Sequence, residues 1–174
     1  MTIDWTRFER ARSEFPVGSH VIGTVSLVPH PGRVGVFVRV NKVDSPAGFV
    51  DGLNLPVDVN LWPSVGDILE FEVTQHTVGQ VRLRPVDPSK MSPIYRRDDA
   101  AWAKLKSQYH IGQLVQGRTM EAYTSNRQYV VDFETHRSVV DYHTSEPPVI
   151  GDIHTYRVVA LLDSTQLMRL ELES

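Results

Sequence analysis

The sequence predicts a mainly β protein made of two small barrels, each preceded by a short helix. Residues 15–25 and residues 109–119 share a frame of an aromatic residue, a glycine, a valine and a second glycine. A Val-Gly-Asp-Ile stretch at residues 65–68 returns as Ile-Gly-Asp-Ile at residues 150–153. The proline-containing stretch 84–97 separates the two copies. These three observations indicate that one structural unit occurs twice.

The proline-containing stretch indicates a domain boundary. Proline donates no backbone hydrogen bond and stops both helices and strands, so three prolines in this stretch are typical of a linker. The chain has 174 residues, a length that accommodates two small domains. We expect a first domain over residues 1–88 and a second domain, which includes the linker, over residues 89–174. The boundary itself is predicted near residue 92.

Each repeat is predicted to begin with a short helix. Asp4 precedes residues 5–15 and Asp98 precedes residues 99–109. A carboxylate in this position accepts hydrogen bonds from the free amides at the start of a helix. Each helix also carries an apolar pair on one face, which we expect to cover the open end of its barrel. These pairs are Trp5 with Phe8, and Trp102 with Leu105.

Five short strands are predicted in the first repeat. Residues 33–40, RVGVFVRV, alternate strictly between two faces, as in a half-buried strand. Gly23 interrupts the first strand, where glycine often marks a bulge or a bend at a barrel corner. The other strands are predicted at residues 21–27, 47–50, 68–73 and 80–85. Five short antiparallel strands with a bent first strand are typical of an OB barrel.

The second repeat has a less regular pattern, and we predict a second barrel from it. Its turn at residues 124–127, TSNR, suits Asn126 in a left-handed conformation. The loop between its third and fourth strands is short and contains Pro147 and Pro148. The strands are predicted at residues 114–123, 128–135, 138–143, 153–161 and 166–173.

Composition and charge narrow the functional classes. Hydrophobic residues make up 41% of the chain, and the net charge is −3, as in an ordinary globular protein. The absence of cysteine excludes disulfides, thiolate zinc sites and cysteine nucleophiles. Residues 1–10 are charged, unlike a signal peptide, and no apolar run approaches the ~20 residues of a membrane span. We therefore expect a cytoplasmic protein without a membrane partner.

The best candidate for a binding site is a cluster of one aromatic and several arginine side chains. Phe37 shares a strand face with Arg33 and Arg39, so the ring can stack on a base while the guanidinium groups contact phosphates. Arg82 and Arg84 alternate with apolar residues and are predicted to extend this basic strip. The alternative interpretation is that Phe37 packs beneath a loop or the helix and that the arginines form an ordinary solvated face.

Catalytic and metal sites have little support in the sequence. His136 and His143 lie seven residues apart, which places strand residues on opposite faces. No HExxH motif, nucleophile elbow or phosphate-binding loop is present. Asp132 and Glu134 share a strand face, and we interpret them as part of the solvent face. We expect no enzyme activity, no metal and no small-molecule cofactor.

The first repeat resembles the S-one motif of ribosomal proteins, an OB-fold RNA-binding domain. The resemblance covers about residues 15–85. It rests on the stretches GSHVIGTV, GVFV, GFVDGLNLP, VGDILEFEV and GQVRL, in this order. The second repeat looks like a diverged copy, because it keeps the first glycine frame and the Ile-Gly-Asp-Ile but lacks the GVFV and GFVDG blocks.

The resemblance implies RNA contacts at particular positions. Members that bind RNA carry two aromatics on the second strand, a histidine at the end of the third, and an acidic and a basic residue in the last hairpin. Phe37 matches the second of these aromatics. The remaining four positions hold other residue types, namely Val34, Asp51, His76 and Gln80.

These observations predict a binding module rather than an enzyme. Two partner classes stay open at this point. The first is single-stranded RNA, bound weakly through the first barrel. The second is a protein partner, with the chain acting as an adaptor, an inhibitor or an immunity-type protein that has kept the OB scaffold and lost nucleic-acid binding.

Overall fold

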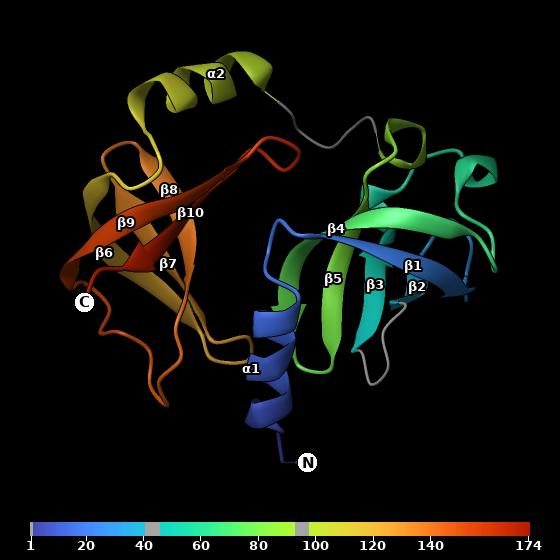
Figure 1. The fold of residues 1–174 in the computed structure, drawn as a ribbon, viewed down its shortest axis with the longest axis horizontal. Coiled ribbons are helices and arrows are strands. Elements are labelled where there is room, and N and C mark those ends of the chain that lie inside the picture. Colours follow the sequence, from blue (N-terminus) through green and yellow to red (C-terminus); the bar gives the residue numbers. More distant parts are fainter. Residues whose placement is uncertain (1, 41–45, 93–97) are drawn as a thin grey trace. The chain divides into compact units, whose positions relative to one another are not determined.

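The computed structural model describes residues 2–40, 46–92 and 98–174. The chain forms two compact units, Met1–Arg96 and Arg97–Ser174. In Figure 1 the first is coloured blue to green and the second yellow to red. The fold is mainly β, with one α-helix and five strands described in each unit, and this confirms the predicted fold class. Among the residues that the structure describes, no helix is long and apolar enough to cross a membrane.

Helix α1 (Trp5–Glu14) begins where the sequence predicts. The Asp4 carboxylate accepts a hydrogen bond of 3.0 Å from the Arg7 amide, which satisfies one free donor of the first turn. Phe8 is buried, and the ring of Trp5 meets it edge-on at 5.4 Å between centroids. The helix packs against strand β4, so its apolar face supplies area to a small core.

The strands of the first unit close into a barrel. They are β1 (His20–Leu27), β2 (Gly35–Val40), β3 (Ala47–Asp51), β4 (Ile68–Thr77) and β5 (Gln80–Pro85). Their order around the barrel is β1-β2-β3-β5-β4, with a parallel pairing between β3 and β5 and antiparallel pairings elsewhere. A closed five-stranded barrel of this order is an OB-type barrel. Three short 3₁₀ turns join or follow these strands: η1 (Gly52–Asn54), η2 (Val59–Leu61) and η3 (Pro88–Lys90).

Gly23 lets strands β1 and β2 approach closely at a corner of the barrel. A Cβ atom at this position would lie 2.4 Å from Cγ1 of Val38, a distance that no side chain tolerates. The β-bulge lies slightly further along the strand, between Val25 and Leu27. The second unit repeats both features. A Cβ at Gly117 would lie 2.2 Å from Cγ1 of Val131, and a bulge follows between Thr119 and Glu121.

The second unit contains α2 and a five-stranded sheet. Asp98 caps α2 by accepting from the Ala101 amide at 2.9 Å, and Trp102 is buried with its Nε1 donating to Asp163 at 2.8 Å. The sheet order is β10-β9-β6-β7-β8, the order of the first barrel with a break between β8 and β10. The elements are α2 (Asp99–Gln108), β6 (Leu114–Tyr123), β7 (Gln128–Phe133), β8 (His136–Asp141), β9 (Ile153–Leu162) and β10 (Leu167–Leu172).

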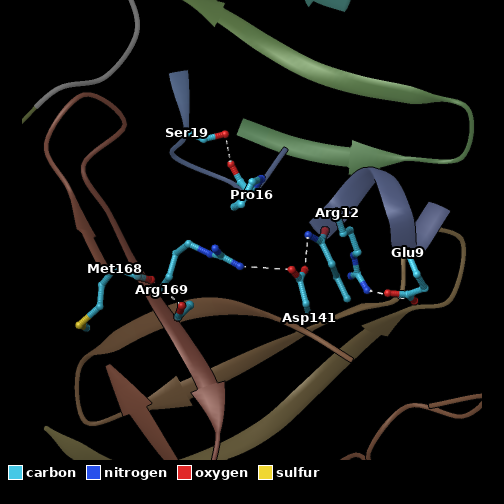
Figure 2. A network of polar contacts seen from close by, with 9 residues as sticks. Glu9, Arg12, Pro16, Ser19, Asp141, Met168 and Arg169 are labelled. Carbon is cyan, nitrogen blue, oxygen red and sulfur yellow. Dashed lines mark hydrogen bonds and ion pairs between the residues drawn. The ribbon is translucent and has the colours of Figure 1, made fainter. Parts of the chain in front are cut away.

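Side chains join the two edge strands of the second sheet. The Ser138 hydroxyl donates to the Met168 carbonyl at 2.7 Å. Arg169 donates to the Asp141 carboxylate at 3.2 Å, and both side chains are less than one-fifth exposed (Figure 2). In the first unit the corresponding seam is a parallel backbone ladder between β3 and β5. The second sheet therefore curls back on itself through side-chain contacts where the first closes through the backbone.

The Gly-Asp turns have the same backbone geometry in both units. Gly66 and Gly151 adopt φ values of 96° and 95°, a region that favours glycine. Their amides donate to the carbonyls of Val25 and Thr119, at 2.9 and 2.8 Å. The predicted left-handed residue of the 124–127 turn was wrong by one position, since Arg127 has φ 48° and Asn126 has no positive φ.

Candidate nucleic-acid interface

Four side chains form a row across the outer face of the first barrel. The strand registers place Leu27 of β1 opposite Phe37 of β2, Phe37 opposite Phe49 of β3, and Phe49 opposite Arg82 of β5. Residues directly opposite each other share a face of the sheet. We call this set the outer row. Three of its four members are apolar, and the fourth is a cation.

The side chains in the middle of the outer row contact one another. The ring centroids of Phe37 and Phe49 are 5.0 Å apart, with their planes tilted by 59°. Cζ of Arg82 lies over the Phe49 ring, 4.6 Å from its centroid, within the range of a cation–π interaction. Phe49 is only 7% exposed. Phe37 and Arg82 are partly exposed, and they present the surfaces that a ligand can reach.

Gly35 makes room for the Phe49 ring. A Cβ atom at Gly35 would lie 2.8 Å from Cζ of Phe49 and 2.2 Å from the carbonyl oxygen of Val50. The residue also adopts a φ of 146°, which side-chain-bearing residues rarely take. The glycine of the GVFV stretch is therefore needed for the outer row to form.

Two further arginines flank the outer row. Arg39 lies two residues beyond Phe37 on the same face of β2, in the next cross-strand row with Ala47 and Gln80. Arg33 was predicted on the strand face of Phe37, but it lies in the exposed connection between β1 and β2, because β2 begins only at Gly35. In residues 2–40, 46–92 and 98–174, neither guanidinium has an ion-pair partner. OB barrels bind oligonucleotides on the β2–β3 face and with the loops beside it, which is where these groups lie.

Arg84 lies apart from the other predicted arginines. Its side chain is only 3% exposed, and its Nε donates to Sδ of Met91 at 3.2 Å. It is paired across the ladder with Glu72, which is also buried. Burial raises the pKa of Glu72, while the positive charge of Arg84 acts in the opposite direction. Arg84 is therefore covered on the outside of the barrel and is not available to a ligand, and the candidate surface consists of the outer row with Arg33 and Arg39.

The second unit has no aromatic pair at the matching positions. Counting along the ladders from Gly23 and from Gly117, Phe37 and Phe49 correspond to a pair of valines, Val130 and Val139. These two valines face each other across β7 and β8 as the two phenylalanines do across β2 and β3. The second sheet therefore offers no stacking surface at this place.

The arginines on the matching face of the second unit are paired with carboxylates. Arg137 donates to both oxygens of Asp132, at 2.7 and 3.1 Å, where the first unit has Ala47 opposite Arg39. This hydrogen bond lowers the pKa of Asp132. Charge that is free in the first unit is thus compensated in the second.

Other predicted features of the second unit have structural roles. Tyr109 donates a hydrogen bond to the Glu134 carboxylate, and its ring packs against those of Phe133 and His136. Burial, followed by the bond to Glu134, raises the pKa of Tyr109 to about 12. Within the described parts of the chain, no group of three or more His, Asp or Glu side chains has a metal-binding arrangement.

Phe49 and Leu27 are members of the outer row that the sequence did not reveal. Phe49 was predicted to lie in a strand, and its alternation with Gly48 and Val50 places it on the outer face. Its partnership with Phe37 and Arg82 depends on the pairing of β2, β3 and β5, which no local pattern encodes.

Comparisons with known proteins give distant structural likenesses. No protein-family model matches the chain, and no curated protein matches it. A multidomain protein with nucleic acid binding domains from Streptococcus pneumoniae is 17% identical, with 90% of this chain and 51% of that chain covered and a TM-score of 0.33. GSP13 from Bacillus subtilis is 22% identical, with 55% and 72% covered and a TM-score of 0.36. Drosophila Unr CSD456 is 14% identical, with 90% and 63% covered and a TM-score of 0.29.

The chain thus spans about half the length of the Streptococcus protein. Superpositions with such low scores decide neither the fold nor the function. The OB assignment of the first unit depends instead on its own strand order and barrel closure.

Proposed function

We propose that the first unit binds single-stranded nucleic acid, RNA in particular, on the outer row. The observation that carries this proposal is the continuous run of Phe37, Phe49 and Arg82 across three neighbouring strands. Stacking on a protein ring contributes about 1–3 kcal/mol per base and tolerates any base, because every base has a π face. The chain acts as a binding module without catalysis.

The spacing of the exposed groups fits a single strand. Phe37 and Arg82 are separated by two strand spacings, roughly 10 Å. Bases stacked in a duplex are only ~3.4 Å apart along each strand. Two bases that contact Phe37 and Arg82 must therefore be unstacked from each other, as they are when single-stranded RNA is splayed on a protein surface.

Phosphate contacts come from the flanking arginines. Arg33 and Arg39 carry charges that no described carboxylate compensates, so they are available to phosphate oxygens. The net charge of the chain is −3, so the long-range attraction for RNA is small. We expect micromolar affinity that falls as salt rises. Each neutralised phosphate of a single strand contributes about −0.7 to the slope of the logarithm of the binding constant against the logarithm of the salt concentration, which we call the salt slope.

The test is fluorescence anisotropy with labelled random single-stranded RNA, at low and at physiological salt. The variants are Phe37→Ala and, as a matched control, Val139→Ala at an exposed position of the corresponding face in the second unit. We expect Phe37→Ala to weaken binding about tenfold or more and the control to leave it unchanged. Absence of wild-type binding at low salt, or equal binding by wild type and Phe37→Ala, would contradict the proposal.

We also infer that the first unit is an S-one-type domain and that the second is a diverged copy of it. The recurring Gly-Asp turns, the two corner glycines and the common strand order support this. The domains are proposed to meet in the linker near residue 92, and the protein is proposed to work in the cytoplasm. In this scheme the second copy keeps the frame and has given up the RNA-binding surface.

A protein partner is the second candidate, and the segment between β3 and β4 favours it. Leu53, within the capped turn η1, is 85% exposed, and Val57, between η1 and the capped turn η2, is 75% exposed. Residues 46–81 contain no lysine or arginine. A partner with apolar and basic side chains suits this segment. Leu53→Ser should leave RNA binding unchanged, and a loss of RNA binding in that variant would place the site on this segment instead.

A further inference from the structure

Arg82 covers the Phe49 ring in the free protein. Its Cζ is 4.6 Å from the ring centroid, and Phe49 is only 7% exposed between Arg82 and Phe37. A base therefore cannot reach the Phe49 ring while Arg82 stays in place. What the surface presents at this end of the outer row is the guanidinium itself.

The corresponding arginine of the second unit is held differently. Counting from the Gly-Asp turns, Arg82 corresponds to Arg169, whose guanidinium donates to Asp141 at 3.2 Å (Figure 2). Asp51 is the counterpart of Asp141. Asp51 pairs with Gly35 at one end of the β2–β3 ladder, and Asp141 pairs with Gln128 at the same end of the β7–β8 ladder. The Asp51 carboxylate accepts instead from the Leu53 amide at 2.9 Å, where it caps η1.

This difference frees Arg82 from an ion pair. With Asp51 engaged in the cap, no ion pair involves Arg82 in the part of the chain that the structure describes, and its guanidinium lies on an aromatic ring. A guanidinium is planar, delocalised and weakly hydrated, so it stacks on an aromatic face and still exposes its other face. The Arg82–Phe49 pair thus forms a flat surface of the kind on which bases stack.

We propose that Arg82, supported by Phe49, is a second base-stacking plane of the site and not a phosphate contact. This inference rests on the proposed RNA binding of the first unit. One base stacks on Phe37 and another on the exposed face of the Arg82 guanidinium. Arg33 and Arg39 hold the phosphates. Phe49 acts as a positioning residue that orients Arg82 without touching the RNA.

Lysine substitutions separate the two roles of an arginine. Arg82→Lys keeps the charge and removes the plane, whereas Arg39→Lys is the matched control for a phosphate contact. Both are measured by RNA anisotropy across a salt series, together with thermal unfolding to verify the fold. We expect Arg82→Lys to bind about tenfold more weakly, as for loss of one stacked base, with an unchanged salt slope because the charge is kept. Arg39→Lys should stay within about twofold of wild type, because lysine serves a phosphate as a point charge.

Three outcomes would overturn the proposal. If Arg82→Lys binds like wild type, Arg82 serves as a charge and not as a plane. If Arg82→Ala binds more tightly than wild type, Arg82 is a cover that competes with bases for Phe49. If Arg82→Lys and Arg39→Lys weaken binding equally, the two arginines have the same role, and Arg82 is not a special stacking plane. These results differ from failure of the proposed function, in which wild type and Phe37→Ala bind alike or wild type does not bind.

A spectroscopic measurement tests the same arrangement without relying on affinity. The ring current of Phe49 should shift the side-chain proton signals of Arg82 upfield in the free protein. Phe49→Leu should abolish this shift, and RNA should move the Arg82 signals more than those of Arg39. Arg82 signals that stay at ordinary positions in the wild type would overturn the stacked arrangement.

Discussion

At the positions where the first barrel carries Phe37 and Phe49, the second unit carries Val130 and Val139. The frames beneath these pairs are alike, with the same strand order and with a corner glycine against a valine in each. The seams differ, since a backbone ladder closes the first barrel and side chains bridge the second. The comparison teaches that turns and inner positions fix the frame, while outward positions are free to carry a binding surface or to lose it.

Electrostatics follow the same division. In the first unit Arg39 and Arg82 make no ion pair with any described carboxylate, and in the second Arg137 and Arg169 are both paired. A paired arginine has little field to offer a phosphate, because its partner cancels most of the charge within a Debye length. The second face has valines in place of the aromatic pair and its arginines are neutralised, so under the proposed function we expect it not to bind RNA.

The largest effect is expected at Gly35, where the backbone of the first unit adopts a positive φ and that of the second does not. Gly35 has φ 146° and no space for a Cβ, whereas the matching residue of the second unit is Gln128, which carries a side chain. Gly35→Ala should lower the free energy of unfolding of the first unit by about 3 kcal/mol, through strain and overpacking against Phe49 and Val50. Amide hydrogen exchange, resolved by residue, would measure this in each unit separately.

Gln128→Ala is the matched control for that substitution. It removes a 3.0 Å hydrogen bond from Gln128 to Asp141 and places no atom in a forbidden position. We expect a cost of about 1 kcal/mol, confined to the second unit. Equal protection of the first unit in wild type and Gly35→Ala would show that the close approach to Phe49 is not required.

The second prediction concerns the seam of the second sheet. Asp141→Asn removes the charge that balances Arg169, and both side chains are mostly buried. We expect the free energy of unfolding of the second unit to fall by about 2 kcal/mol, less than for a fully buried pair. Asp51→Asn is the counterpart and should be nearly neutral, because asparagine caps a turn as well as aspartate. Denaturant unfolding followed in each unit would check both, and a neutral Asp141→Asn would mean that the seam does not depend on the ion pair.

The sequence predicted the frame of both units closely. Both helices start after their predicted caps, Asp4 and Asp98, and all ten strands lie within a few residues of the predicted ranges. The reason is that capping, alternation and glycine turns are local patterns, and each pattern was present twice. The local errors concern turns and strand ends. Arg127 and not Asn126 took the left-handed position, Glu134 lies with φ 52° in the turn after β7, and β2 begins at Gly35, two residues after its predicted start.

The candidate site was predictable only in part, because it depends on register. Phe37 was identified from its own strand, but its contact with Phe49 requires the pairing of β2 with β3. Arg82 and Arg84 looked equivalent in sequence, yet one lies on the outer row and the other is buried beside Glu72. The two arginines share a face of β5, and Arg84 is the one that is covered, with Met91 and Glu72 beside it. Such a cover has no reliable signature in a single sequence.

A smaller effect is expected from the free and paired arginines. Arg39→Gln should reduce the salt slope of RNA binding by about 0.7, because one phosphate contact is lost. Arg137→Gln, at the matching face of the second unit, should leave the salt slope unchanged, because the Asp132 carboxylate already neutralises the charge of Arg137. Anisotropy titrations at four salt concentrations, spanning low to physiological, would measure both slopes. A reduced slope for Arg137→Gln would indicate that the second unit also contacts RNA.

The smallest effect at neutral pH is expected from Tyr109→Phe. Tyr109 corresponds to Phe15 in the repeat, so this substitution gives the second unit the residue of the first. The pKa of Tyr109 is about 12 in the folded state against an ordinary value of 10.0, because burial and then the bond to Glu134 favour the neutral hydroxyl. Below pH 10 both states keep the proton, so the contribution of Tyr109 to stability is fully present. Between pH 10 and about 12 the unfolded state releases the proton first, and the free energy of unfolding falls as pH rises.

Tyr109→Phe should lose less stability over this interval than the wild type, in unfolding curves recorded from pH 8 upward. If the free energy of unfolding falls in parallel for the wild type and Tyr109→Phe, the pKa of Tyr109 is the same in the folded and unfolded states. The hydroxyl would then not explain a difference between the two units at this position.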